Sequence, residues 1–172
     1  MRNTLVIGVG NILLRDDGAG VHAMRELRDS QPPLESTDFI DAGTLNFMLA
    51  TDIESAGNLI VFDAADFAAE PGSIRCFVNG DFDDFLFSGS RSAHEIGIAD
   101  LMDFARMLDR VPNNRALIGL QPEIIDWGDW LSEAVEAAVP QAVALARGLI
   151  ESWNSPARRA RTHAADTYHV RA

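Results

Sequence analysis

The stretch of sequence that decides the fold is VIGVGNILLRDDGAGV, residues 6–21. It follows a pattern of strand, turn and helix. The apolar run over residues 5–9 contains several β-branched side chains and ends at a Gly-Asn pair, which predicts a buried strand. After the turn at Asp16 and Asp17, apolar residues recur at helical spacing over 21–28, and Gln31-Pro32-Pro33 closes that helix. A strand that passes directly into a helix in this way is typical of α/β proteins.

The rest of the chain continues this alternation. Further strands are predicted over residues 39–41, 59–63, 73–78 and 115–120, and helical segments over 47–53, 92–108 and 131–149. Residues 79–91 are polar and contain glycine, and we expect a loop there with an apolar strip of Phe82, Phe85 and Phe87. These phenylalanines are a candidate docking strip, although a small satellite core is the plainer role for them. The alternation predicts an α/β fold of three layers, with helices on both faces of a twisted, mostly parallel five-stranded sheet.

The length of 172 residues suits one domain, which we expect over residues 1–154. Residues 155–172 contain four arginines and one acid and lack a clear apolar face, so we expect a flexible, arginine-rich tail. No apolar run approaches the roughly 18 residues that a membrane span needs, and the first residues lead straight into a strand. We therefore expect neither a span nor a signal peptide.

The composition excludes several classes of protein. The net charge of −12 argues against a general nucleic-acid binder, which needs a basic face for phosphate contacts. All fourteen basic residues are arginines, so there is no lysine for a Schiff base or a phosphate-binding loop. The single Cys76 rules out an internal disulfide and a multi-cysteine metal site, favours a cytoplasmic setting, and is expected in the core.

Acidic residues follow three of the predicted strands. Asp16 and Asp17 come after the first strand, Asp41 ends the second, and Asp63 ends the third. A single acid in such a place is usually a helix cap or a turn former. If the strands are parallel, however, their carboxyl ends meet at one edge of the sheet, where ligands of open α/β sheets bind. Carboxylates gathered there repel one another unless a cation binds them, so the edge is a candidate cation site.

His94 is the histidine best placed to join such a site. It follows Ser92 in a Ser-x-x-Glu capping box, which puts it in the first turn of a predicted helix. There the positive end of the helix dipole favours the neutral imidazole that a metal requires. Two carboxylates and one imidazole suit a borderline divalent ion such as nickel, zinc or iron. The plainer alternative is a capping or surface histidine.

Other ligand sites and nucleophiles fit the sequence poorly. Gly8 and Gly10 begin a dinucleotide fingerprint, but Leu13 stands where its third glycine belongs, and the adjacent acids would repel a pyrophosphate. The serine-hydrolase motif G-x-S-x-G is absent as well. We therefore expect no tightly held organic cofactor.

Four segments resemble, in order and spacing, the hydrogenase maturation endopeptidases. They are GVGNILLRDDGAGV (residues 8–21), DAGT (41–44), VFDAADFAAEPG (61–72) and SAHEIGIADLM (92–102). The resemblance covers residues 4 to 150 and is closest to the branch that serves membrane-bound uptake hydrogenases. It implies a cytoplasmic endopeptidase that removes the C-terminal extension of the nickel–iron hydrogenase large-subunit precursor after nickel insertion.

The resemblance also implies roles for particular residues. The metal-contacting positions of the family fall on Asp17, Asp63 and His94, with Asp16 and Asp41 as possible auxiliary acids. Nickel would arrive on the substrate, where it positions the peptide and polarises a carbonyl or activates water. Whether a carboxylate acts as the general base stays open. The family is sometimes grouped with aspartic peptidases, but no D-T-G pair is present. A monomer is expected. The alternative is a non-proteolytic nickel sensor or chaperone on the same fold.

Overall fold

The computed structural model describes residues 3–43, 48–87 and 93–155, with only the backbone for 93–96. Its centre is one five-stranded sheet in the order β2-β1-β3-β5-β4. The strands are β1 (Thr4–Val9), β2 (Thr37–Gly43), β3 (Asn58–Ala64), β4 (Ile74–Val78) and β5 (Asn114–Leu120). Every neighbouring pair is parallel except β4 and β5, which are antiparallel. The predicted five-stranded, mostly parallel sheet is confirmed.

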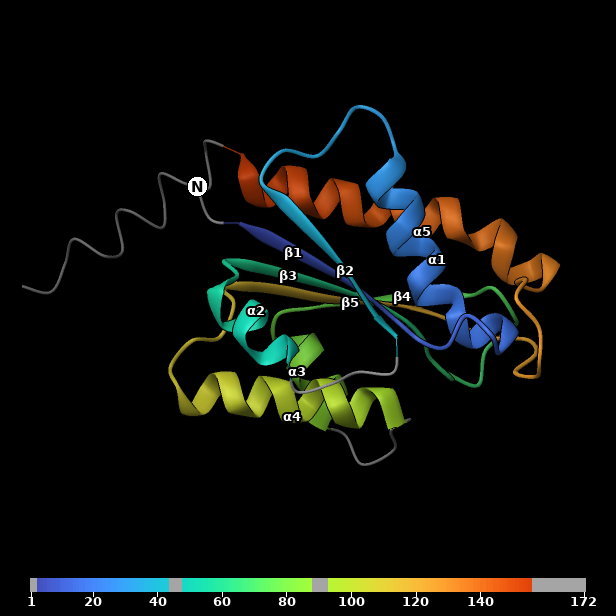
Figure 1. Ribbon diagram of the computed structural model, residues 1–172, viewed down its shortest axis with the longest axis horizontal. Coiled ribbons are helices and arrows are strands. Elements are labelled where there is room, and N and C mark those ends of the chain that lie inside the picture. The colour runs from blue at the N-terminus through green and yellow to red at the C-terminus, as the bar shows by residue number, and fades with distance from the viewer. Residues whose placement is uncertain (1–2, 44–47, 88–92, 156–172) are drawn as a thin grey trace, which may run out of the picture.

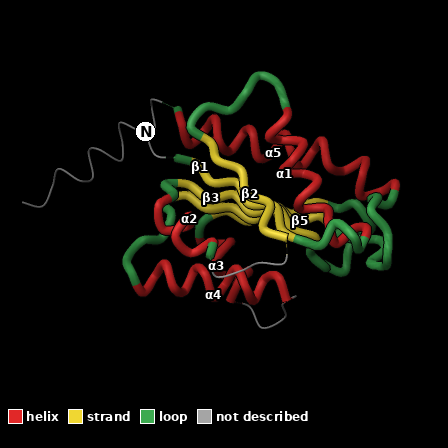
Figure 2. Tube along the Cα trace, viewed as in Figure 1, coloured by secondary structure: helices red, strands yellow, loops and turns green. Residues whose placement is uncertain are grey.

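Helices cover both faces of this sheet and make three layers (Figure 1). On one face lie α1 (Ala19–Asp29) and α5 (Glu133–Asn154), and a short 3-10 turn, η1 (Arg15–Gly18), leads into α1. On the other face lie α2 (Leu49–Ser55), α3 (Gly80–Phe87) and α4 (Ala93–Met107). In Figure 2 the strands form the middle layer between these two groups of helices. In the described part of the chain, no helix is long and apolar enough to cross a membrane.

The alternation of side chains along β3 divides the interior into two cores. Ile60 and Phe62 pack with α1 and α5, whereas Leu59 and Val61 pack with α2, α3 and α4. Every residue of β3 is buried, as expected for a central strand covered on both faces. The burial of these apolar faces is the main favourable contribution to folding. It also determines to which side each residue at a strand end points.

Glycines of the opening segment let α1 begin directly on the strand ends. A Cβ atom on Gly20 would lie 2.3 Å from the carbonyl oxygen of Phe62, and one on Gly8 would lie 2.7 Å from that of Gly20. Gly10 has a φ of +121°, and its Cβ would lie 1.7 Å from the carbonyl oxygen of Asp17. No other residue type fits these close approaches. These glycines therefore serve backbone packing between strand and helix.

Two predictions about local structure were wrong. Residues 80–87 form the helix α3 and not a loop, while residues 88–91 lie outside the description. Phe82 is fully buried, and the ring of Phe85 stacks on Phe77 with centroids 4.3 Å apart. Phe82 therefore belongs to the core beneath α2, α3 and α4 and Phe85 packs against it, whereas Phe87 is 41% exposed. Cys76 lies in a strand as predicted but is exposed rather than in the core, because β4 is an edge strand. Of the predicted tail at 155–172, residues 156–172 lie outside the described residues.

Candidate functional site

The candidate site lies at the carboxyl edge of the parallel strands, where β3 ends and η1 begins. Asp63 is the penultimate residue of β3 and is fully buried. It alternates with Phe62 and Ala64, so it lies on the same face as Val61, toward α2, α3 and α4. Its register partner in β5 is Gly119. A Cβ atom on Gly119 would lie only 2.4 Å from the ring of Phe67, so that ring occupies the space beside Asp63. Asp63 therefore has an apolar wall beside it.

Asp17 lies at the same edge, in η1. Its side chain is partly buried and folds back over the end of β1, where its Oδ2 accepts a hydrogen bond of 2.7 Å from the backbone amide of Asn11. The turn that carries it packs against β3. The structure thus brings Asp17 and the end of the strand that carries Asp63 to one edge of the sheet.

Asp16 points the other way, into the segment between β5 and α5. It is fully buried, and Ser132 donates to both of its oxygens, from its amide to Oδ1 at 2.6 Å and from its hydroxyl to Oδ2 at 2.7 Å. The amides of Glu123 and Ile124 also donate to Oδ2, each at 2.9 Å. Desolvation by burial raises the pKa of Asp16, but these hydrogen bonds together outweigh it, so the pKa lies below its ordinary value. Asp16 is a structural carboxylate that holds two loops together.

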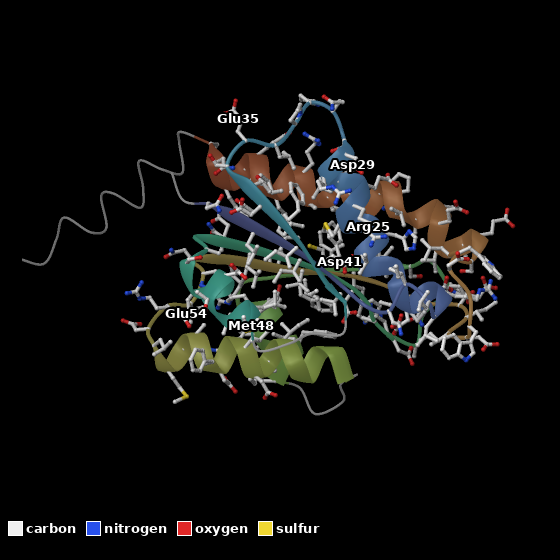
Figure 3. The ribbon with its side chains drawn as sticks, viewed as in Figure 1. Arg25, Asp29, Glu35, Asp41, Met48 and Glu54 are labelled. Carbon is white, nitrogen blue, oxygen red and sulfur yellow. The ribbon has the colours of Figure 1, made fainter. Side chains whose placement is uncertain are left out.

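Asp41 lies on the opposite face of the sheet from Asp63. Asp41 pairs with Gly8 of β1, and a side chain at Gly8 would point toward α1. The Oδ2 atom of Asp41 accepts a hydrogen bond of 2.7 Å from Arg25 of that helix. The two side chains lie close together in Figure 3. The Oδ1 atom of Asp41 accepts a second hydrogen bond from the amide of Gly43. The strand ends meet at one edge as expected, but the acids they carry divide between the two faces.

His94 is the second residue of α4, so it lies in the first turn of a helix as predicted. Its side chain and the proposed cap, Ser92, lie outside the described residues. The helix covers the face of the sheet on which Asp63 lies. Among the side chains that the structure describes, no three from His, Cys, Asp and Glu are grouped closely enough to hold a metal ion. This finding does not cover the proposed ligand set, because the side chain of His94 lies outside the described residues.

Sequence reasoning missed the role of the segment over residues 121–132. Four hydrogen bonds tie it to Asp16, and the backbones of Leu14 and Gly128 form an isolated parallel bridge. The segment carries Trp127 and Trp130, both largely exposed. Two tryptophans set among the acids of this loop were the signal that could have identified it, because large apolar side chains on a surface often mark an interface.

Comparison with known proteins identifies the fold and the family. The model of the hydrogenase maturation protease family matches residues 21–148. The hydrogenase expression/formation protein HupD of Bradyrhizobium diazoefficiens is 33% identical over 150 residues, which cover 87% of this chain and 78% of that protein. The hydrogenase 2 maturation protease of Escherichia coli is 29% identical over 139 residues, covering 81% of this chain and 85% of its own.

Solved structures agree with the sequence comparison. The hydrogenase maturating endopeptidase HybD from E. coli superposes with a TM-score of 0.82 at 26% identity, over 88% of this chain and 94% of that one. The nickel–iron hydrogenase maturation protease HybD from Thermococcus kodakarensis reaches a TM-score of 0.71 at 31% identity, over 86% and 99% of the two chains. The family resemblance of the four sequence segments is confirmed. This chain belongs to the hydrogenase maturation protease family and is a hydrolase of the endopeptidase class.

Proposed function

We propose that this endopeptidase removes the C-terminal extension of a nickel–iron hydrogenase large-subunit precursor once nickel is in place. We further propose that it recognises the nickel of its substrate through Asp17, Asp63 and His94. The metal belongs to the substrate in this scheme, so the protease needs no resident metal of its own. The observation that carries the proposal is the fully buried carboxyl group of Asp63 at the end of the central strand.

Burial makes the carboxyl group of Asp63 costly for the fold. A carboxyl group beside an aromatic ring loses much of its hydration, and an apolar residue would satisfy a buried strand at lower cost. Charged groups that are retained in such places are concentrated at functional sites. A divalent ion carried in by the substrate would supply the opposite charge that favours the ionised form.

The different surroundings of the adjacent acids support Asp17 as the second ligand. The carboxylate of Asp16 already accepts hydrogen bonds from Ser132, Glu123 and Ile124, and turning it toward a metal would leave those buried donors without acceptors. Asp17 is partly exposed and lies over the end of β1. It can therefore meet a substrate without disrupting the loop beneath.

The donor set suits nickel chemistry. Imidazole nitrogen and carboxylate oxygen are ligands of borderline divalent ions, and the first turn of α4 favours the neutral imidazole that coordination needs. Two carboxylates and one imidazole would complete the coordination of a metal that the precursor already holds. Binding through the metal would fix the adjoining peptide in position for hydrolysis. A precursor without nickel would lose this anchor, which would make cleavage depend on nickel insertion.

The test is a processing assay with purified protease and purified precursor. The nickel-loaded precursor should lose its C-terminal extension, and the nickel-free precursor should keep it, as measured by mass spectrometry of the large subunit. Absence of cleavage in the loaded precursor would contradict the proposed substrate. Equal cleavage of both forms would contradict nickel recognition. A monomeric state and a cytoplasmic location stay predictions from the sequence.

A further inference from the structure

An exposed apolar surface adjoins the candidate site. Its members are Leu13, Ile125, Trp127 and Trp130, with exposed fractions of 53%, 57%, 77% and 59%, and we call it the tryptophan surface. Leu13 belongs to the loop that precedes Asp17, and the other three belong to the segment between β5 and α5. In Figure 1 these two segments lie side by side at one end of the molecule. Contiguous apolar patches of this kind mark interaction sites.

Backbone hydrogen bonds hold the two halves of this surface together. The amide of Gly128 donates to the carbonyl of Leu13 at 3.0 Å, and the amide of Arg15 donates to the carbonyl of Gly128 at 2.9 Å. The guanidinium carbon of Arg15 lies 5.5 Å from the ring centroid of Trp130. The carboxylate of Asp16 anchors the same segment from below. The exposed side chains therefore project from a fixed backbone, so little conformational entropy is lost when a partner binds them.

The position of the tryptophan surface indicates its partner. Its first residue lies four positions before Asp17, at the carboxyl edge of the sheet. A protein substrate whose scissile peptide reaches Asp17 comes within reach of this surface. Ile124, exposed at 36%, lies in the same segment, whereas Met107, exposed at 82%, lies on a different element. Met107 ends α4, close to where the chain enters β5, which is the amino edge of the sheet.

The charges around the surface indicate the chemistry of the segment that binds. Glu123, Asp126 and Asp129 lie in the same loop and are exposed. Acidic residues around an apolar centre favour a partner with an apolar segment flanked by arginine or lysine. Tryptophan is among the residues that most often dominate binding energy at protein interfaces.

We propose that the tryptophan surface is the docking surface for the hydrogenase large-subunit precursor, and that it binds an apolar segment flanked by basic residues. This inference rests on the proposed function, because it takes the precursor as substrate. It assigns to Trp127 and Ile125 a role in substrate affinity that is separate from the chemistry at Asp17 and Asp63. Loss of the surface should raise KM and leave kcat unchanged.

The experiment compares Trp127→Ala, Trp127→Phe and Met107→Ala in steady-state processing of the nickel-loaded precursor. Trp127→Ala should raise KM by about ten- to a hundredfold, as expected for loss of a tryptophan that dominates binding, with kcat within about twofold of wild type. Trp127→Phe should recover part of the affinity, and Met107→Ala should match wild type. Thermal unfolding of each variant checks that the fold is intact. Because Trp127 is mostly exposed, its replacement should cost little stability.

The outcomes separate this inference from the proposed function. If wild-type protease does not process the precursor, the proposed function fails, and binding of the precursor measured directly still tests the surface. If wild type processes the precursor and Trp127→Ala has an unchanged KM, the docking surface is wrong. Sedimentation of the protease alone tests whether a second copy of the chain occupies the surface. If wild type forms a dimer, Trp127→Ala does not, and KM is unchanged, the surface belongs to that dimer and not to the precursor. KM should rise with added salt, and a salt-independent KM would contradict the basic flanks.

Discussion

The two faces of the sheet treat the acids at its carboxyl edge differently. On the α1 face, Asp41 is about two-fifths exposed and pairs with Arg25. On the α4 face, Asp63 is fully buried beside an aromatic ring. Both acids lie near the carboxyl end of a parallel strand, and their position along the sequence does not distinguish them. The register explains the difference. Asp41 pairs with Gly8 of β1, whereas the residue of β3 that pairs with Gly8 is Phe62. Asp63 comes one position later, so its side chain points to the other face. An acid at a strand end is therefore informative only once its face is known.

The largest expected effect comes from removing the proposed ligands. Asp17→Asn, Asp63→Asn and His94→Ala should each lower processing of nickel-loaded precursor at least about a hundredfold, because each removes one donor to the substrate's metal. The measurement is the rate of loss of the C-terminal extension, with circular dichroism to check the fold. Normal processing by His94→Ala would show that the site is wrongly assigned.

A loss of stability is expected when the structural acid is removed. Asp16→Ala leaves the amides of Ser132, Glu123 and Ile124 without their acceptor, which should lower the free energy of unfolding by on the order of 3 kcal/mol. Urea unfolding measures this. Asp129→Ala is the matched control, since that acid is exposed in the same loop and should change stability by less than about 0.5 kcal/mol. Equal stability of the two variants would contradict the anchoring role.

The lowered pKa of Asp16 predicts a dependence of stability on pH. A carboxyl group whose pKa is lower in the folded than in the unfolded protein stabilises the fold above its unfolded pKa of about 3.8, and this contribution is lost as pH falls through the folded value. Unfolding free energy should therefore fall more steeply below pH 4 in wild type than in Asp16→Asn. Parallel pH profiles for the two proteins, measured by urea unfolding, would contradict this.

A small effect is expected on the exposed face. Asp41→Ala removes a solvent-exposed ion pair with Arg25, which typically contributes less than about 1 kcal/mol. Processing of the precursor should stay within about threefold of wild type, because the side chain lies on the other face from Asp63. A loss comparable to that of Asp63→Asn would mean that both faces take part in the reaction.

The smallest effect is expected from the arginine-rich tail. Deletion after Asn154 should leave stability and processing nearly unchanged. The cut spares Trp153, which is only 6% exposed and packs in the core with α1. Thermal unfolding and the processing assay measure the result. A large fall in processing with an unchanged unfolding temperature would indicate that the tail contacts the substrate.

Sequence alone determined the architecture and the family. Apolar runs bounded by glycine, proline and acids locate strands and helices because hydrophobic periodicity is local, and four spaced motifs were specific enough to identify the family. The helix over residues 80–87 was missed because the acidic and glycine residues of NGDFDDFLF suggest a loop, while burial of Phe82 and Leu86 favours the helix. Burial on the sheet outweighed the local signal.

Only the tertiary structure decided what each acid does. The neighbouring positions of Asp16 and Asp17 cannot reveal that Ser132, more than a hundred residues away, holds the carboxylate of one and not the other. The tertiary structure alone also places Leu13 beside Trp127 and Trp130 in one surface. The opening segment predicts the turn that brings its two acids to the sheet edge. Hydrogen bonds and packing between distant segments assign them different roles, because such contacts depend on the folded arrangement of the whole chain and not on local spacing.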